Sequence, residues 1–151
     1  YVVEPVEVIV QHVLEDLNPR FPLEVAAGDV VVAGKHFGQS SGRAIAVKAL
    51  RETGVGAVVA ETFARTFFRN AFEVGLPVLE LPGVTGLVSD GDILSVDVAA
   101  GLFHNETTGV QREVAPPDPF LLDMLEAGGL IALTRSRREL FEDRPDQRAG
   151  R

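Results

Sequence analysis

The stretch V-V-V-A-G-K-H-F-G-Q-S-S-G-R-A-I-A-V-K-A-L, residues 30–50, decides the fold. It opens with a β-branched run, continues through a glycine- and serine-rich loop at residues 34–43, and closes with an apolar run of helical composition. A buried strand joined to a helix by a short loop is the repeating unit of parallel sheets. We therefore predict a strand over 29–33 and a helix over 44–51, with Ser41 or Gly42 near the helix N-cap.

The same alternation continues downstream. Residues 56–60 and 76–81 form two further short apolar runs, each typical of a buried strand. Between them, Phe63–Glu73 has apolar residues at helical spacing, with Thr62 as a candidate N-cap and Gly75 as a C-terminal stop. These segments predict a mostly parallel central sheet with flanking helices, an α/β fold.

The pattern changes in the second half of the chain. Residues 93–99 alternate between apolar and polar with period two, and short strand-like segments follow at 102–105 and 110–114. Turn residues separate them, so we predict a small antiparallel meander. Residues 118–126 indicate a helix with Asp118 as N-cap and a proline at its first position.

The two ends of the chain carry weaker signals. Residues 6–10 predict a strand, residues 18–22 a loop, and residues 130–134 a last strand. Residues 135–151 are charged and lack apolar periodicity, which predicts a frayed tail. We accordingly expect one domain over 1–134 followed by a tail.

Composition excludes several classes of function. A chain of 151 residues, 46% hydrophobic, can bury the core of one domain. It contains no cysteine, so disulfides, thiolate metal sites and cysteine nucleophiles are excluded. A net charge of −8 argues against a nucleic-acid partner, and no apolar run is long enough for a membrane span. We expect a cytoplasmic protein.

The loop at residues 34–43 has the chemistry of a small-anion site. Backbone N–H groups there would lie at the positive end of the following helix, at the sheet edge where α/β proteins bind ligands. Ser40 and Ser41 add hydroxyls, and Arg43 can hold a carboxylate through two parallel hydrogen bonds. Neither phosphate-loop nor dinucleotide motif is present, so carboxylates are better candidates than nucleotides. The alternative is a simple strand-to-helix turn with capping serines.

Three longer motifs resemble one family. They are F-A-R-T-F-F-R-N-A at 63–71, V-D-V-A-A-G-L-F-H-N-E-T-T-G at 96–109, and P-F-L-L-D-M-L-E-A-G-G-L-I at 119–131. Together with the loop they resemble the small subunits of 3-isopropylmalate dehydratase, which correspond to the swivelling domain of aconitase. The resemblance extends from Gly28 to Thr134 and implies a swivelling β/β/α fold.

The resemblance implies a hydro-lyase of leucine biosynthesis that dehydrates and rehydrates a hydroxy-dicarboxylate or hydroxy-tricarboxylate. In this family a [4Fe–4S] cluster belongs to a separate large subunit, so this chain would bind no cofactor itself and be active only with that partner. The substrate stays open among isopropylmalate, homocitrate or homoaconitate, citramalate-like acids and other branched hydroxy acids. The alternative is a non-catalytic, partner-binding or regulatory subunit with a degenerate loop.

By the same resemblance, Ser41 removes the proton α to a carboxylate and Arg43 binds a carboxylate. Gln39, Ser40 and Gly42 would complete the substrate contacts. Shifting the alignment to the family loop by one residue would make Ser40 the base. Aligning Arg43 with the carboxylate-binding arginine of the family favours Ser41 instead. The loop departs from the usual family pattern, which has cysteine, glycine and serine where this chain has Gln39, Ser40 and Gly42. These departures predict an unusual substrate.

Overall fold

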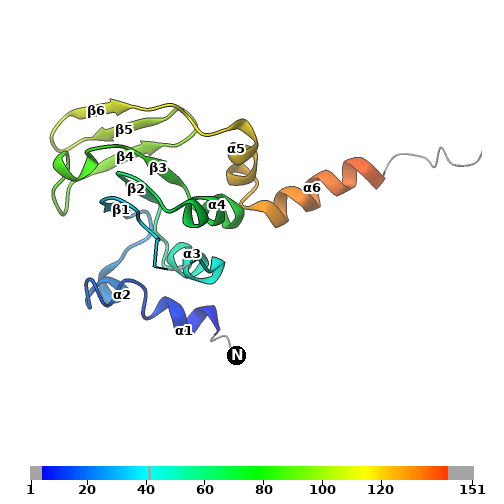
Figure 1. Ribbon diagram of the computed structural model, residues 1–151, viewed down its shortest axis with the longest axis horizontal. Helices are drawn as coiled ribbons and strands as arrows, with labels where there is room; N and C mark the ends of the chain where they lie inside the picture. The colour runs from blue at the N-terminus through cyan, green and yellow to red at the C-terminus, as the bar shows by residue number, and fades with distance from the viewer. Residues whose placement is uncertain (1–4, 41, 143–151) are drawn as a thin grey trace, which may run out of the picture.

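The computed structural model describes residues 5–40 and 42–142, and its centre is a short parallel sheet (Figure 1). Strands β1 (Val30–Ala33), β2 (Ala57–Ala60) and β3 (Val78–Glu80) lie in the order β1-β2-β3. All pairs are parallel, with Ala33 opposite Ala60 and Ala60 opposite Glu80. The predicted parallel sheet is therefore confirmed, and the carboxyl ends of its strands meet at one edge.

A second sheet covers one face of the first. Strands β4 (Leu94–Asp97), β5 (Leu102–Asn105) and β6 (Val110–Glu113) pair antiparallel in chain order, which confirms the predicted meander. Figure 1 shows this sheet above β1–β3 and helices below them, three layers in all. The predicted β/β/α architecture is confirmed.

Helices form the third layer and the two ends of the described chain. They are α1 (Val6–Val10), α2 (Phe21–Glu24), α3 (Ala44–Glu52), α4 (Arg65–Val74), α5 (Pro119–Glu126), α6 (Leu130–Glu142) and a 3-10 turn, η1 (Val84–Gly86). Gly75 ends α4 in the left-handed conformation, φ 75°, as predicted. Among the described residues, no helix has the length and apolarity needed to cross a bilayer.

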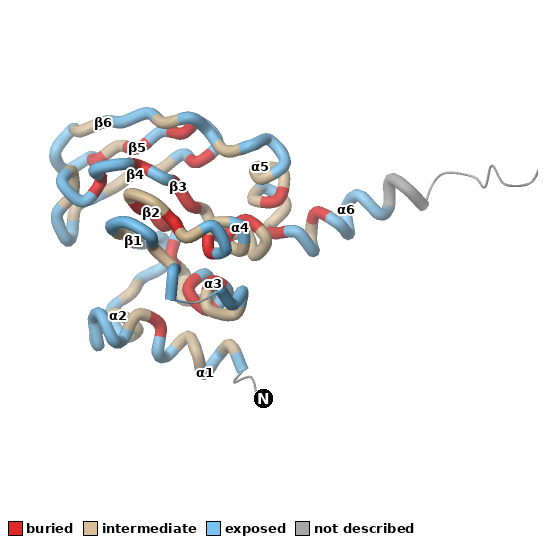
Figure 2. The backbone as a smooth tube through the Cα atoms, in the orientation of Figure 1, coloured by how far each residue is buried: buried red, intermediate tan, exposed pale blue. Residues whose placement is uncertain are grey.

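The core has two parts, divided by the parallel sheet. Strand β2 is buried along its whole length (Figure 2). Val58 and Ala60 pack among the helices, whereas Val59 packs between the two sheets, because successive strand residues point to opposite faces. Burying one such valine contributes about 1.5–3 kcal/mol. This double burial explains why β2 is an uninterrupted apolar run.

The strand predicted at residues 6–10 is wrong, because this segment is helix α1. Val6, Ile9 and Val10 pack against the helix-side core, and α1 contacts α3. Their spacing of three and four places them on one face of a helix. The loop predicted at 18–22 is also interrupted, since α2 begins at Phe21.

The strand predicted at residues 130–134 is wrong as well. After Gly128 and Gly129, both at positive φ, the chain turns into helix α6, and Leu133 becomes buried. Residues 135–142 continue this helix, which extends away from the body in Figure 1. Residues 143–151 lie outside the described part, and the domain boundary at 134 stays a prediction.

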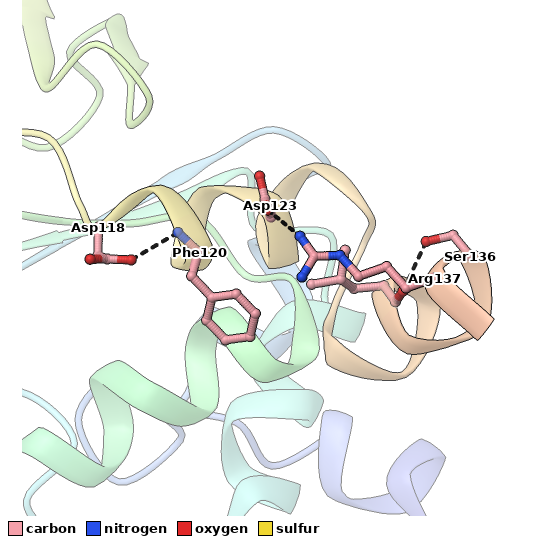
Figure 3. A network of polar contacts seen from close by, with 6 residues as sticks. Asp118, Phe120, Asp123, Ser136 and Arg137 are labelled. Carbon is pink, nitrogen blue, oxygen red and sulfur yellow. Dashed lines mark hydrogen bonds and ion pairs between the residues drawn. The ribbon is translucent and has the colours of Figure 1, made fainter. Parts of the chain in front are cut away.

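Polar contacts fix the start of α5 and join it to α6 (Figure 3). The Asp118 carboxylate accepts a hydrogen bond from the Phe120 N–H at 2.8 Å, so the predicted N-cap is confirmed. Arg137 of α6 donates to the Asp123 carboxylate of α5, and its guanidinium lies 5.8 Å from the centroid of the Phe120 ring. An aspartate cap of this kind contributes about 1 kcal/mol.

Candidate active-site loop

The loop between β1 and α3 leaves the carboxyl edge of the parallel sheet, as the sequence predicts. Its last residue, Arg43, is the N-cap of α3, with extended backbone at φ −91° and ψ 128°. Arg43 accepts a hydrogen bond from the Ala46 N–H at its carbonyl. Of the two residues predicted near the N-cap, Gly42 precedes it directly, and Ser41 lies outside the described residues.

The first half of the loop is tied to the segment that follows β2. Thr62 accepts two hydrogen bonds: its hydroxyl from the His36 N–H at 2.8 Å, and its carbonyl from the Phe37 N–H at 3.0 Å. The Phe37 carbonyl in turn accepts from the Ala64 N–H at 2.9 Å, and Phe37 forms a parallel bridge with Phe63. Strand-like pairing thus continues past the end of the sheet.

Thr62 is not the N-cap of α4, contrary to the sequence prediction. The N-cap is Ala64, and no side chain caps this helix. The Thr62 hydroxyl instead accepts the His36 N–H, so the threonine serves the neighbouring loop rather than its own helix.

An aromatic cluster supports the loop from below. The Phe37 ring packs edge-on against Phe67, with centroids 5.0 Å apart, and Phe63 stacks on Phe67 at 5.8 Å. Gly38 lies directly on this cluster: a Cβ at that position would come within 2.3 Å of the Phe67 ring. Its φ of +83° also favours glycine. The backbone of the loop therefore rests against α4.

The described candidate residues gather on the exposed end of the loop. Gln39, Ser40, Gly42 and Arg43 are all exposed. Gly42 lies near the first turn of α4, where a Cβ would be 3.7 Å from the Thr66 methyl. The structure therefore places these four residues in one exposed stretch, beside the N-terminal ends of α3 and α4.

Two carboxylates at the same sheet edge were missed by the sequence analysis. Glu61 follows β2 and accepts a hydrogen bond from the Thr85 hydroxyl, and Glu80 ends β3 and accepts from the Phe63 N–H at 3.3 Å. Their position directly after apolar runs was the available signal. Both engage donors of their own chain, which connects the ends of β2 and β3 to the loops beyond them.

The comparisons with known proteins agree on one family. The Aconitase C-terminal domain family matches residues 18–83. The 3-isopropylmalate dehydratase small subunit 1 of Archaeoglobus fulgidus is 45% identical over 138 residues, which are 91% of this chain and 85% of that protein. The chain belongs to the 3-isopropylmalate dehydratase small-subunit family.

Other members of this family give the same picture. The 3-isopropylmalate dehydratase small subunit of Pyrobaculum neutrophilum is 52% identical over 124 residues, 82% of this chain and 76% of that protein. A crystal structure of 3-isopropylmalate dehydratase from Methanocaldococcus jannaschii superimposes with a TM-score of 0.86 at 32% identity, covering 95% of this chain and 84% of that one. The predicted class, a hydro-lyase small subunit of the aconitase family, is confirmed, and the non-catalytic alternative is not favoured.

Proposed function

We propose that this chain acts with an iron–sulfur large subunit to dehydrate and rehydrate a hydroxy-dicarboxylate of the 3-isopropylmalate type. One observation carries the proposal. A loop with two serines and an arginine leaves the carboxyl edge of a parallel sheet and enters a helix, in a chain whose named relatives are small subunits of that enzyme. Ligands of open α/β sheets bind at this edge.

Each loop residue has a proposed role. The Ser41 oxygen, as an alkoxide, takes the proton from the carbon α to a carboxylate during dehydration and becomes a hydroxyl, while the hydroxyl group of the neighbouring carbon leaves as hydroxide. During hydration the same proton and hydroxide return to the substrate. Arg43 binds a substrate carboxylate through its guanidinium, a charge-assisted hydrogen bond that also orients the acid. Ser40, Gln39 and Gly42 complete the contacts, with Gly42 allowing close approach of the backbone.

The residues of this chain do not fit an iron–sulfur cluster. It contains no cysteine, and the described residues include no group of three or more histidine, aspartate or glutamate side chains that could hold a metal. Clusters of this kind are held by cysteine thiolates. We therefore assign the cluster to the large subunit, where it would supply a Lewis acid. As a separate point, we infer a cytoplasmic location for the complex.

Co-expression with candidate large subunits tests the function. The purified complex is assayed for hydration and dehydration of a panel of branched hydroxy-dicarboxylates and hydroxy-tricarboxylates, with the isolated chain as control. We expect activity from the complex and none from the chain alone. A stable complex that turns over no acid of the panel would contradict the proposal.

The role of Arg43 is tested in the same complex. Arg43→Ala removes the guanidinium, and we expect KM for the preferred acid to rise about 10- to 100-fold, because hydrogen bonds to charged groups contribute about 1.5–3 kcal/mol. Arg51→Ala is the matched control, since Arg51 is an exposed arginine in the last turn of the same helix. Equal KM values for the two variants would exclude Arg43 as the carboxylate ligand.

A further inference from the structure

The contact between Thr62 and the β1–α3 loop joins two segments that are 26 residues apart in sequence. It places a side-chain hydroxyl against the backbone N–H of His36, at 2.8 Å, and the Thr62 carbonyl against the next N–H, of Phe37, at 3.0 Å. Thr62, which follows β2, therefore accepts hydrogen bonds from two consecutive backbone amides that follow β1. The carbonyl contact continues the pairing of the strands, whereas the hydroxyl contact is specific to the side chain.

The hydroxyl acts where the loop backbone is least favourable. His36 has a φ of +57°, a left-handed conformation in which a residue with a Cβ is strained by about 1–2 kcal/mol. The His36 carbonyl accepts from the Gln39 N–H at 3.1 Å, closing a turn that contains Gly38. The Thr62 hydroxyl thus accepts from the N–H of His36, and the carbonyl of His36 accepts from the N–H of Gln39. Gln39 is the first of the candidate substrate contacts.

We propose that Thr62 is a positioning residue, whose hydroxyl fixes the left-handed turn at His36 and thereby holds Gln39 and Ser40 in their orientation. The inference rests on the proposed function, because it concerns the alignment of that site. Thr62 touches loop backbone and acts only through it.

A capping role for Thr62 is excluded by the geometry of α4, which begins after Ala64 with no side-chain cap. A general stabilising role is separable by substitution. Thr62→Val keeps the branched shape and the carbonyl bond to Phe37, and it leaves the aromatic cluster of Phe37, Phe63 and Phe67 in place. Thr62→Ser keeps the hydroxyl and loses only the methyl group.

The test uses both variants in two measurements. Hydrogen exchange of the ¹⁵N-labelled chain measures the hydrogen bond between the His36 N–H and the Thr62 hydroxyl directly. In Thr62→Val the His36 amide should exchange up to about tenfold faster, the factor that corresponds to one hydrogen bond. In the complex with the large subunit, Thr62→Val should lower kcat about tenfold or more and also raise KM, because a misplaced loop affects both the reacting geometry and the substrate contacts. Thr62→Ser should restore the exchange rate and both kinetic constants.

The outcomes separate the two proposals. Wild-type exchange at His36 in Thr62→Val would show that the hydroxyl does not hold the loop, and faster exchange with wild-type kcat would show that the turn does not matter to catalysis. Either result overturns the positioning role and leaves the hydro-lyase intact. A complex that lacks activity even with unaltered Thr62 overturns both.

Discussion

At the residue scale, Gly38 is the position where the loop backbone comes closest to α4. A Cβ at this position would lie 2.3 Å from Cγ of Phe67, much closer than van der Waals contact, and its φ of +83° strains any other residue. We expect Gly38→Ala to lower the free energy of unfolding by about 2–5 kcal/mol, the sum of overpacking and backbone strain. Urea denaturation of the isolated chain measures the change.

Gly34→Ala is the matched control at the start of the same loop. A Cβ there meets nothing within 4 Å, and its φ is not in the left-handed region. The free energy of unfolding should change by no more than about 0.5 kcal/mol. If both alanine variants were equally stable, the packing of Gly38 against Phe67 would not describe the protein in solution.

At the element scale, the sequence predicted the strands of the sheets better than the ends of the chain. Strand β2 is paired on both sides and buried along its whole length, so residues 57–60 form a continuous apolar run, and the edge strand β1 is half-buried and apolar over Val30–Ala33. The run at 6–10 is equally apolar but forms one helical turn on the core, since five residues do not distinguish the two periods. The strand prediction for residues 130–134 failed for the same reason.

The missed features of the candidate site all depend on contacts between distant segments. A threonine before a helical pattern predicts an N-cap, and nothing local shows that Thr62 binds a loop 26 residues upstream. The left-handed turn at His36 was equally invisible, because positive φ is uncommon for any residue other than glycine, even for histidine, which is enriched there. The sequence thus located the loop, and the tertiary contacts determine its shape.

The meander offers a prediction about pH. Asn105, fully buried in β5, donates to the Asp92 carboxylate at 2.7 Å, and the Ser89 N–H donates to the same carboxylate at 2.8 Å. The Ser89 backbone bond first, and the Asn105 bond second, lower the pKa of Asp92. The stabilisation of the fold by the ionised Asp92 carboxylate is therefore complete above the pKa of this aspartate in the unfolded chain, about 3.9. It is lost as the pH falls through the lowered pKa of Asp92 in the folded protein.

Asp92→Asn removes this titration. Denaturation midpoints measured between about pH 5 and pH 2 should fall less steeply for Asp92→Asn than for the unaltered chain. Asp90→Asn, two residues earlier in the same turn, is the control and should keep the wild-type slope. Identical slopes for all three proteins would show that Asp92 contributes nothing to acid sensitivity.

At the scale of the whole molecule, the three layers explain how a small subunit presents a loop without enclosing a site. The two sheets and the helices bury β2, and the loop projects from the carboxyl edge with Gln39, Ser40 and Arg43 exposed. The exposed side chains belong to a surface that another subunit can complete. Activity is therefore expected of the complex as a whole.

The most direct measurement of this account is kcat of the reconstituted complex carrying Ser41→Ala, compared with Ser40→Ala and the unaltered chain. We predict that Ser41→Ala lowers kcat at least about 100-fold, as loss of a general base does, without weakening assembly with the large subunit. Ser40→Ala removes only a proposed substrate contact, so it should raise KM and retain most of kcat. Wild-type kcat in the Ser41→Ala complex, or a greater loss in Ser40→Ala, would contradict the assignment of the base to Ser41.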